Sequence, residues 1–357
     1  MLLASASGVL AEPLAIESRL EPAPTRDRKV VRRFALPGKP HGLALGADGT
    51  AYVGLAGPQA VIAVDPATGD VKKKAVLDSA EIASTKELVT LRTNVDKSRL
   101  YIANGSDESA SILSLPDLGV IREITMEGET IRDVVPDPRG RYVYLLGRRV
   151  HVFDGEGDIE LRALPVDNPM AIATTTDGSI LAVVGTETFD DTRVTSVWLF
   201  DTSNFNEISR EPLQTEDPIE LVMFADRGRS VVAFGRNRLY EKRVTSKPTR
   251  ITAGGDGSGP MQVKVGDVVN GTHACLPENS GPQIATLTGN DTMLVYAERR
   301  CSASASFTGS NSGILPASLY NVPAYALTYD AKTNSILATD RAGYLTIYHV
   351  PRAALSR

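Results

Sequence analysis

The sequence contains few of the residues that build metal and redox centres. Its 357 residues include two cysteines, Cys275 and Cys301, and only four histidines. Two thiols are too few for an iron–sulfur cluster or for a zinc site made only of cysteines, so we expect no cofactor held by this chain. The two cysteines are either buried thiols or, in an oxidising compartment, a disulfide that brackets one structural repeat.

Several catalytic and binding signatures are also absent. The chain has no CxxCH haem attachment, no GxSxG nucleophile elbow, no P-loop and no GxGxxG following a strand. No run approaches the ~18 consecutive apolar residues of a membrane span, so no transmembrane segment is predicted. The net charge is -5 and the basic residues are scattered, whereas nucleic-acid binding without sequence preference needs a basic face. We therefore expect no nucleic-acid partner.

Apolar residues are plentiful, and they alternate with polar ones in short runs. Hydrophobic residues make up 42% of the chain but aromatic residues only 6%, which predicts a core built from Val, Ile, Leu and Ala strands. Residues 40–77 show the pattern most clearly, with Asp/Gly turns at 47–49 and 65–69. This stretch predicts one four-stranded antiparallel meander with strands over 41–45, 50–55, 60–64 and 71–77.

The turn before the second strand of this meander recurs along the chain. Its markers are Gly49, Ser98, Gly140, Gly178, Gly228, Gly271 and Asn334. Most are separated by roughly 40 to 50 residues, which is the period of propeller blades. Seven markers predict an all-β fold, a seven-bladed β-propeller.

The two ends of the chain predict how such a ring would close. Residues 29–36 form an expected strand without a partner nearby in the sequence, and the chain ends with only three expected strands, over 325–329, 335–339 and 344–350. If the N-terminal strand joins this last sheet as its outer strand, no sheet edge is left exposed. We therefore assign 1–28 to a signal-peptide remnant and linker and 29–357 to the propeller.

The sixth repeat has two possible registers. Either 261–265 is its first strand and 281–285 lies in its third, or 283–287 is the first strand and 247–281 is an insertion. The first register keeps the marker spacing and leaves a Ser/Gly-rich insertion around 301–323. A loop of this length is mobile or functional, so we expect 302–321 to be a partner contact.

The N-terminus bears on the compartment. The first eleven residues, MLLASASGVLA, are apolar and small, and Val9-Leu10-Ala11 precedes Glu12-Pro13 like a signal-peptidase site, although a positive n-region is missing. This favours a periplasmic or extracellular protein. The alternative is a disordered tail of small residues.

The repeat also resembles a known family. The segment TAYVGLAGPQAVIAVDPATGDVKKKAVL, echoed by RLYIANGSDESASILSL, resembles the YVTN-type seven-bladed β-propeller repeat of bacterial exported proteins. The resemblance covers most of the chain from about residue 29 as architecture and implies the same fold. The GH and WD signatures of WD40 proteins are not present.

A ligand site is expected where the first strands open onto one mouth of the central channel. Polar side chains at the start of these strands would form a ring that binds a small polar or anionic ligand: His41, Glu87, Arg132, Glu220 and Tyr325. Met170 and Gln262 complete the ring. The alternative is that these residues are solvated loop ends that form internal ion pairs.

Pro40-His41 also resembles the start of a first strand in the propeller lactonases. This resemblance implies a hydrolase in which His41 acts as general base on a lactone and Arg132 stabilises the oxyanion. Only Pro40 and His41 match that family's motif; its other site residues have no counterpart placed in this sequence. The acidic loop with Glu187, Asp190 and Asp191 lacks the spacing of a calcium loop, so we expect no metal site.

The sequence favours a non-catalytic role over chemistry. We predict an exported propeller that acts as a protein-protein interaction scaffold or as a subunit of a larger assembly, with an unidentified ligand. The alternative is a lactonase-like hydrolase that uses the channel mouth. A third possibility is a subunit of a redox complex whose cofactor is bound by another chain.

Overall fold

The structure is a computed structural model. It describes residues 18–23, 30–56, 60–77, 90–103, 108–189, 192–213, 219–225, 230–235, 239–243, 326–330, 332–333, 335–340 and 342–349. Within these residues every regular element is a β-strand, and neighbouring strands pair antiparallel. The chain divides into two compact units. The first comprises 1–136, 156–158 and 325–349, and the second comprises 137–155, 159–324 and 350–357.

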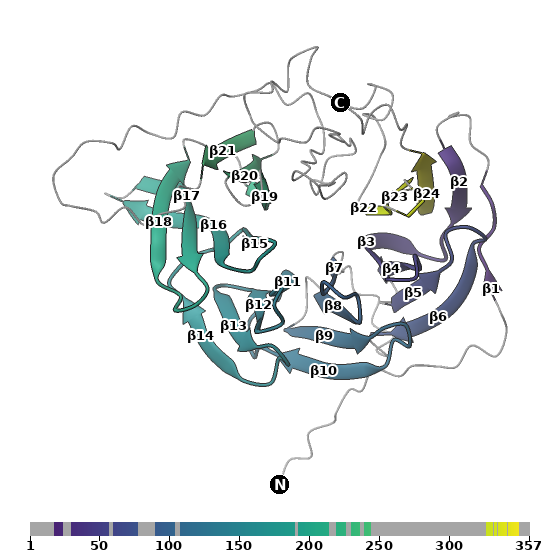
Figure 1. Ribbon diagram of the computed structural model, residues 1–357, viewed down its shortest axis with the longest axis horizontal. Coiled ribbons are helices and arrows are strands. Elements are labelled where there is room, and N and C mark those ends of the chain that lie inside the picture. Colours follow the sequence, from purple (N-terminus) through teal and green to yellow (C-terminus); the bar gives the residue numbers. More distant parts are fainter. Residues whose placement is uncertain are drawn as a thin grey trace, which may run out of the picture. The chain divides into compact units, whose positions relative to one another are not determined.

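The predicted meander forms the first sheet of the first unit (Figure 1). Its strands are β3 (Lys39–Leu45), β4 (Ala51–Ala56), β5 (Ala60–Val64) and β6 (Asp70–Val76). These four strands confirm the expected ones to within two residues. Each pairs with its neighbour in sequence, and short Asp/Gly turns join β3 to β4 and β5 to β6.

A fifth strand, β1 (Ser18–Arg19), extends this sheet from within the segment expected to be a linker. Ser18 pairs with Val71 and Arg19 with Asp70 on β6, and Leu20 is buried in the core behind them. A two-residue strand with a single apolar neighbour has no periodicity, so no sequence pattern indicated it.

The predicted pairing of the two chain ends is confirmed. β2 (Val30–Ala35) pairs antiparallel with β24 (Tyr344–His349) and forms the outer strand of a sheet with the order β2-β24-β23-β22 (Figure 1). The other two strands are β23 (Ser335–Thr339) and β22 (Ala326–Asp330). Arg33 holds the outer strand to β24 and to the turn before it, by an ion pair of 3.2 Å to Asp340 and by stacking 3.8 Å from the ring centre of Tyr344.

The first unit also contains a second sheet, of order β10-β9-β8-β7, and the strand β11. The bounds of these strands are β7 (Thr90–Thr93), β8 (Arg99–Ala103), β9 (Ser109–Ser114), β10 (Val120–Thr125) and β11 (Asp133–Pro136). The innermost strands contact one another in the order β22, β3, β7 and β11. Two apolar clusters fill the space between successive sheets, one around Val53 and Leu337 and one around Tyr52 and Leu100.

The second unit repeats this organisation. It contains β12 (Tyr142–Leu146), β13 (Val150–Asp154), β14 (Glu160–Leu164), β15 (Ala171–Thr174), β16 (Ile180–Phe189), β17 (Thr192–Asp201), β18 (Glu207–Leu213), β19 (Ile219–Ala225), β20 (Ser230–Gly235) and β21 (Leu239–Arg243). One sheet has the order β15-β16-β17-β18 and another β19-β20-β21. Their shared core includes Val184 and Val231.

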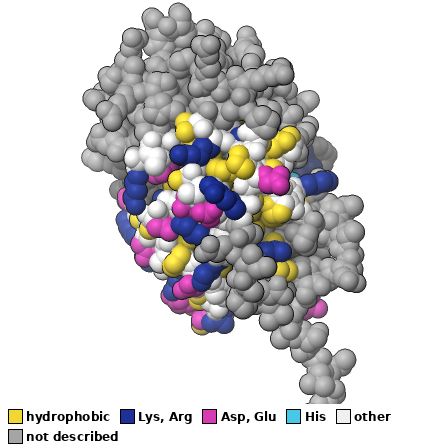
Figure 2. Space-filling model, turned by 90° about the vertical axis from the view of Figure 1, so that its right-hand side faces the viewer, with side chains coloured by type: hydrophobic (Ala, Val, Ile, Leu, Met, Phe, Trp, Pro, Cys, Tyr) yellow, Lys and Arg dark blue, Asp and Glu magenta, His cyan; other side chains and the backbone are white. Residues whose placement is uncertain are grey.

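Side chains of both charge signs alternate on the surface. Ion pairs join Arg19 to Asp70 and Lys73 to Asp117. On the face drawn in Figure 2, the Lys and Arg side chains of the described residues lie among Asp and Glu side chains, without a large area of one sign. None of the described segments forms a helix that is long and apolar enough to cross a membrane.

The repeated turns show why their markers could be read from the sequence. In four turns, the residue with a left-handed backbone donates its N–H to the carbonyl three residues earlier: Gly49, Lys97, Gly140 and Gly178. Three of these are marker glycines, as the left-handed region requires. In the second repeat the left-handed residue is Lys97 (φ 58°), one position before the expected marker Ser98. Ser98 donates two bonds to Asp96, as Thr50 does to Asp48 and Ser179 to Asp177, so the expected marker was one residue late.

Candidate functional site

The structure describes the side chains of two of the five predicted channel-mouth residues. His41 lies in β3 and is buried, with 8% of its surface exposed. Arg132 precedes β11 and is exposed, and desolvation by the surrounding protein lowers its pKa while Glu129 opposes this effect. Glu220 lies in β19, in the other unit. Glu87, Tyr325, Cys275, Cys301, the 301–323 insertion and the sixth repeat lie outside the described residues.

An ion pair that the sequence analysis missed joins two innermost strands of the first unit. Arg92 on β7 donates from Nε to Asp133 Oδ1 at 2.9 Å and from Nη2 to Asp133 Oδ2 at 2.6 Å. Desolvation alone would lower the pKa of Arg92, but the Asp133 carboxylate raises it overall. A charged residue in a strand that is packed between sheets needs a partner, so the position of Arg92 between Leu91 and Thr93 was a signal in the sequence for such a pair. Both charges are satisfied by each other, and the pair is structural.

A basic concave site of about 430 Å³ lies in the second unit. It is lined by three arginines, one carboxylate and three neutral polar side chains: Arg148, Arg149, Arg193, Asp167, Asn168, Thr186 and Thr188. We call it the arginine pocket. Arg148 and Arg149 occupy the turn between β12 and β13, Asp167 and Asn168 lie between β14 and β15, and the others belong to the β16–β17 hairpin. The pocket therefore combines three segments that are separate in the sequence.

The β16–β17 hairpin forms one wall of the arginine pocket. Its strands have ten residues each and pair along their whole length, from Ile180↔Asp201 to Phe189↔Thr192. β15 pairs with this hairpin only as far as Val184, and β18 pairs only as far as Thr195. The outer part of the hairpin therefore extends beyond both neighbouring strands. Arg193 is exposed there, opposite Thr188.

Close backbone contacts fix the other wall against the hairpin. The Thr186 N–H donates to the carbonyl of Asp167 at 3.0 Å, and Asn168 Nδ2 lies 3.4 Å from Thr186 Oγ1. A Cβ atom at Gly185 would lie only 2.8 Å from that carbonyl of Asp167, so glycine is needed for the approach. Asn168 has a φ of 42°, a conformation that asparagine tolerates better than most residues. The pocket is thus shaped by backbone contacts as well as by its exposed side chains.

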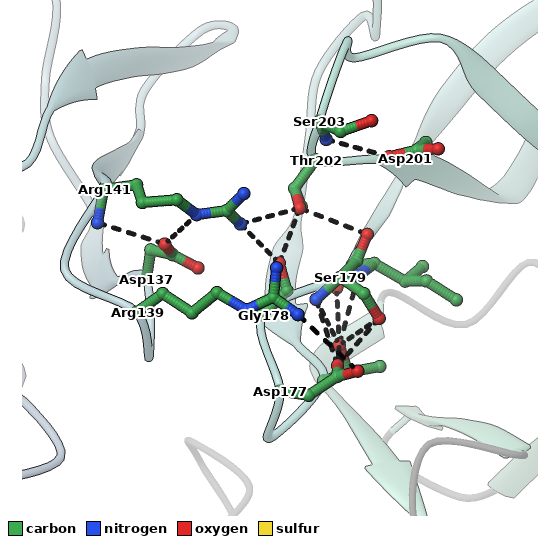
Figure 3. A network of polar contacts seen from close by, with 11 residues as sticks. Asp137, Arg139, Arg141, Asp177, Gly178, Ser179, Asp201, Thr202 and Ser203 are labelled. Carbon is green, nitrogen blue, oxygen red and sulfur yellow. Dashed lines mark hydrogen bonds and ion pairs between the residues drawn. The ribbon is translucent and has the colours of Figure 1, made fainter.

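A different arginine lies at the other end of β12 and is fully engaged (Figure 3). Arg141 Nε donates to Asp137 Oδ2 at 3.0 Å, and Arg141 Nη2 donates to the Gly178 carbonyl at 2.8 Å and to Thr202 Oγ1 at 2.9 Å. The hydrogen bond with Asp137 is the main reason that the pKa of Arg141 is raised. Asp137 is buried. We call this network the arginine clamp, because it ties the turn before β12 to two turns of the next sheet.

The acidic loop weighed as a calcium site is described only at Glu187. Its carboxylate accepts from Ser196 Oγ at 2.7 Å and from Arg210 Nη1 at 2.9 Å, while Asp190 and Asp191 lie outside the described residues. The Glu187 oxygens thus serve an ion pair across the sheet. Over the described part of the chain, no group of three His, Cys, Asp or Glu residues is arranged to bind a metal.

The arginine pocket was not predicted from the sequence. In the sequence, Arg148 and Arg149 are one adjacent pair among the scattered basic residues. Its place at the turn between a second and a third strand was a signal that could have been used, since loops of a propeller face converge. Nothing in the sequence indicated that Arg193 and Asp167 lie near the turn between β12 and β13, because this proximity depends on the length of the β16–β17 hairpin.

Comparisons with known proteins establish the fold and no more. No protein-family model matches the sequence, and no curated protein matches it either. Among solved structures, the Myceliophteria thermophila Cps50 (Swd1) β-propeller domain is similar with a TM-score of 0.64 and 14% identity, over 89% of this chain and 100% of that one. A structure of Kuenenia stuttgartiensis hydrazine synthase has a TM-score of 0.66 and 13% identity, over 91% of this chain and 99% of that one. The chain therefore has a β-propeller fold.

Proposed function

We propose that the protein is an exported, non-catalytic β-propeller that acts as a protein-interaction scaffold or as a subunit of a larger assembly. The observation that carries this proposal is the β16–β17 hairpin. Residues 187–189 and 192–194 pair only with each other, whereas the rest of the hairpin is held between β15 and β18. Its exposed residues include Thr188, Thr192 and Arg193. An extension that the core does not require is well placed to contact a partner.

We also propose that the ring has seven sheets and is closed by β2. The pairing of β2 with β24 supports closure, because the N-terminal strand supplies the outer strand of the last sheet. The contacts of β22, β3, β7 and β11 in succession support a radial arrangement of sheets. The seven turn markers in the sequence support the proposed number of seven sheets.

The solved structures support the interaction role only through the fold. A propeller presents many loops on a rigid support, which suits recognition without chemistry. One of the two similar structures is a propeller domain and the other belongs to an enzyme. Because one fold hosts both kinds of function, the hairpin and not the fold carries the proposal.

Export is proposed from the N-terminal eleven residues and from the resemblance to exported repeat proteins. Fractionation of the source cells followed by N-terminal sequencing tests it. We expect the protein in the periplasm or medium with Glu12 as its first residue. An uncleaved chain recovered with cytosolic proteins would contradict export and leave the interaction role untouched.

The interaction role is tested by purifying the tagged protein from its source and measuring the mass of the purified species by light scattering. A second chain in fixed ratio is expected. The matched variant replaces residues 188–193 with Asn-Gly, which joins the Glu187–Val194 pair through a two-residue turn, keeps the register and retains the contacts of Glu187 with Ser196 and Arg210. This shortened hairpin should keep the melting temperature within a few degrees but lose the second chain. A monomer recovered alone from the native protein would overturn the role.

A further inference from the structure

The arginine pocket has the chemistry of an anion site. Three guanidinium groups line it against one carboxylate, that of Asp167. Guanidinium stays protonated at all physiological pH values and binds carboxylate or phosphate oxygens through two parallel hydrogen bonds. The polar groups of Asn168, Thr186 and Thr188 add neutral donors and acceptors. The site therefore favours a negatively charged ligand that also makes neutral hydrogen bonds.

The size of the pocket and the placement of its arginines on two sides favour a ligand with more than one charged group. A volume of about 430 Å³ is more than ten times the ~30 Å³ of one water molecule. Arg148 and Arg149 come from one turn, whereas Arg193 comes from the hairpin wall. Separate cations on two sides match carboxylates that are spaced along a chain. The acceptor oxygens of Asp167 match the N–H groups between such carboxylates and would repel a compact dianion.

Other arginines of the same unit show what a structural role looks like. Arg141 is held by Asp137 and Arg210 by Glu187 and Glu207, at distances of 2.8 to 3.0 Å. Arg193 is exposed, as Arg210 is, but it stands at the outer part of the hairpin and lines a concave site, which Arg210 does not. It contributes little to the core, so its placement is explained better by an external ligand.

We propose that the arginine pocket binds the carboxylates of an acidic peptide segment. This inference rests on the proposed interaction role, because it names the chemistry of the partner. The pocket and the extended hairpin form one recognition surface: the arginines hold the acidic side chains, and Thr186, Thr188 and Asn168 hydrogen-bond to the peptide between them.

A fluorescein-labelled octaglutamate peptide, titrated with the full-length protein and followed by anisotropy, tests the inference. We expect Arg193→Gln and the double change Arg148→Gln/Arg149→Gln each to weaken binding by about tenfold, the loss expected for one charge-assisted hydrogen-bonded contact. Arg139→Gln is the matched control, because Arg139 is exposed and precedes β12 whereas Arg148 follows it. This control should change the affinity by less than about twofold.

The peptide and its competitors distinguish the ligand chemistry. Octaglutamine should bind at least about tenfold more weakly than octaglutamate, since it lacks the charges. Inorganic phosphate should displace octaglutamate only at higher concentration than glutarate does. Stronger displacement by phosphate, or equal losses in the pocket variants and in Arg139→Gln, would overturn the inference.

The failure of this inference is distinguishable from failure of the interaction role. If the shortened hairpin loses its partner but the Arg148→Gln/Arg149→Gln/Arg193→Gln protein keeps it, the interaction role stands and the acidic-segment inference is wrong. If octaglutamate binds through the three arginines but no chain co-purifies, the pocket inference stands and the interaction role is wrong. A melting curve of each variant confirms that the sheets remain folded.

Discussion

The two ends of β12 carry arginines in opposite situations. Before the strand, Arg141 donates to a buried carboxylate, a backbone carbonyl and a hydroxyl, all within 3.0 Å. After the strand, Arg148 and Arg149 are exposed and line a concave site together with Arg193. The same side chain therefore joins sheets at one end and faces solvent at the other. The buried carboxylate and the two turns that Arg141 contacts give it a structural role, whereas the exposure of Arg148, Arg149 and Arg193 around a concave site is what the proposed ligand site requires.

The comparison predicts that substitutions lower stability more in the arginine clamp than in the arginine pocket. Removing one member of a buried pair leaves a charge without its partner in a region that water does not reach. Neutralising an exposed arginine removes only a solvated charge, and such substitutions usually change stability by less than about 0.5 kcal/mol. We therefore expect substitutions in the arginine clamp to lower the free energy of unfolding, and substitutions in the arginine pocket to weaken ligand binding.

The largest expected effect is at Gly178, which the clamp surrounds. Its φ is 63°, and a Cβ atom there would overlap with Asp137 Oδ1. Gly178→Ala should lower the free energy of unfolding by about 3 kcal/mol, the sum of the backbone and overpacking costs. Urea denaturation measures the loss. Gly140→Ala is the control: its φ is 68° but nothing lies within 4 Å, so only about 1 kcal/mol is expected. Equal losses would show that the clamp is not tightly packed.

The Arg92–Asp133 pair gives a second structural test, in the first unit. Arg92→Gln should lower the unfolding free energy by about 2 kcal/mol, less than the ~3–5 kcal/mol of a fully buried pair, because the Arg92 side chain is 38% exposed. Arg193→Gln in the pocket should change it by less than about 0.5 kcal/mol. A loss at Arg193 as large as that at Arg92 would mean that the pocket arginine is structural too.

His41 separates the interaction role from the hydrolase alternative. His41→Ala removes a buried side chain from β3 and should lower the unfolding free energy by about 1 kcal/mol, while the second chain still co-purifies. Lactone hydrolysis is measured in parallel. Turnover by the native protein that is abolished in the variant would contradict a non-catalytic role.

The smallest effect concerns pH and the exposed turn at Asp177. Burial would raise the pKa of this carboxyl, but hydrogen bonds from Thr175 and Ser179 lower it overall. The folded state thus binds this proton less readily than the unfolded state. The ionised Asp177 carboxylate therefore stabilises the folded state at pH values above the ordinary carboxyl pKa of about 3.9. This contribution is lost as the pH falls through the lower pKa that Asp177 has in the folded state. Asp177→Asn should be less stable than the native protein at pH 6, and the difference should narrow towards pH ~3 in urea titrations.

The local features of the fold and the pairing of its two chain ends could be predicted from the sequence, whereas the arginine pocket could not. The strands of residues 40–77 follow from alternating apolar residues, and turns such as that at Gly49 follow from hydrogen bonds between residues two or three apart. The pairing of β2 with β24 was predicted because each end lacked a local partner. The pocket was missed because it depends on two non-repeated features: a hairpin of ten-residue strands and a glycine that admits a carbonyl.

The most direct test of the account is hydrogen–deuterium exchange of the full-length protein with and without its co-purified partner. The account predicts that the partner slows exchange in peptides covering 147–149 and 186–194, and leaves the clamp turns at 137–141 and 177–179 unchanged. Protection confined to the clamp turns, with none at the hairpin or the arginine turn, would contradict it.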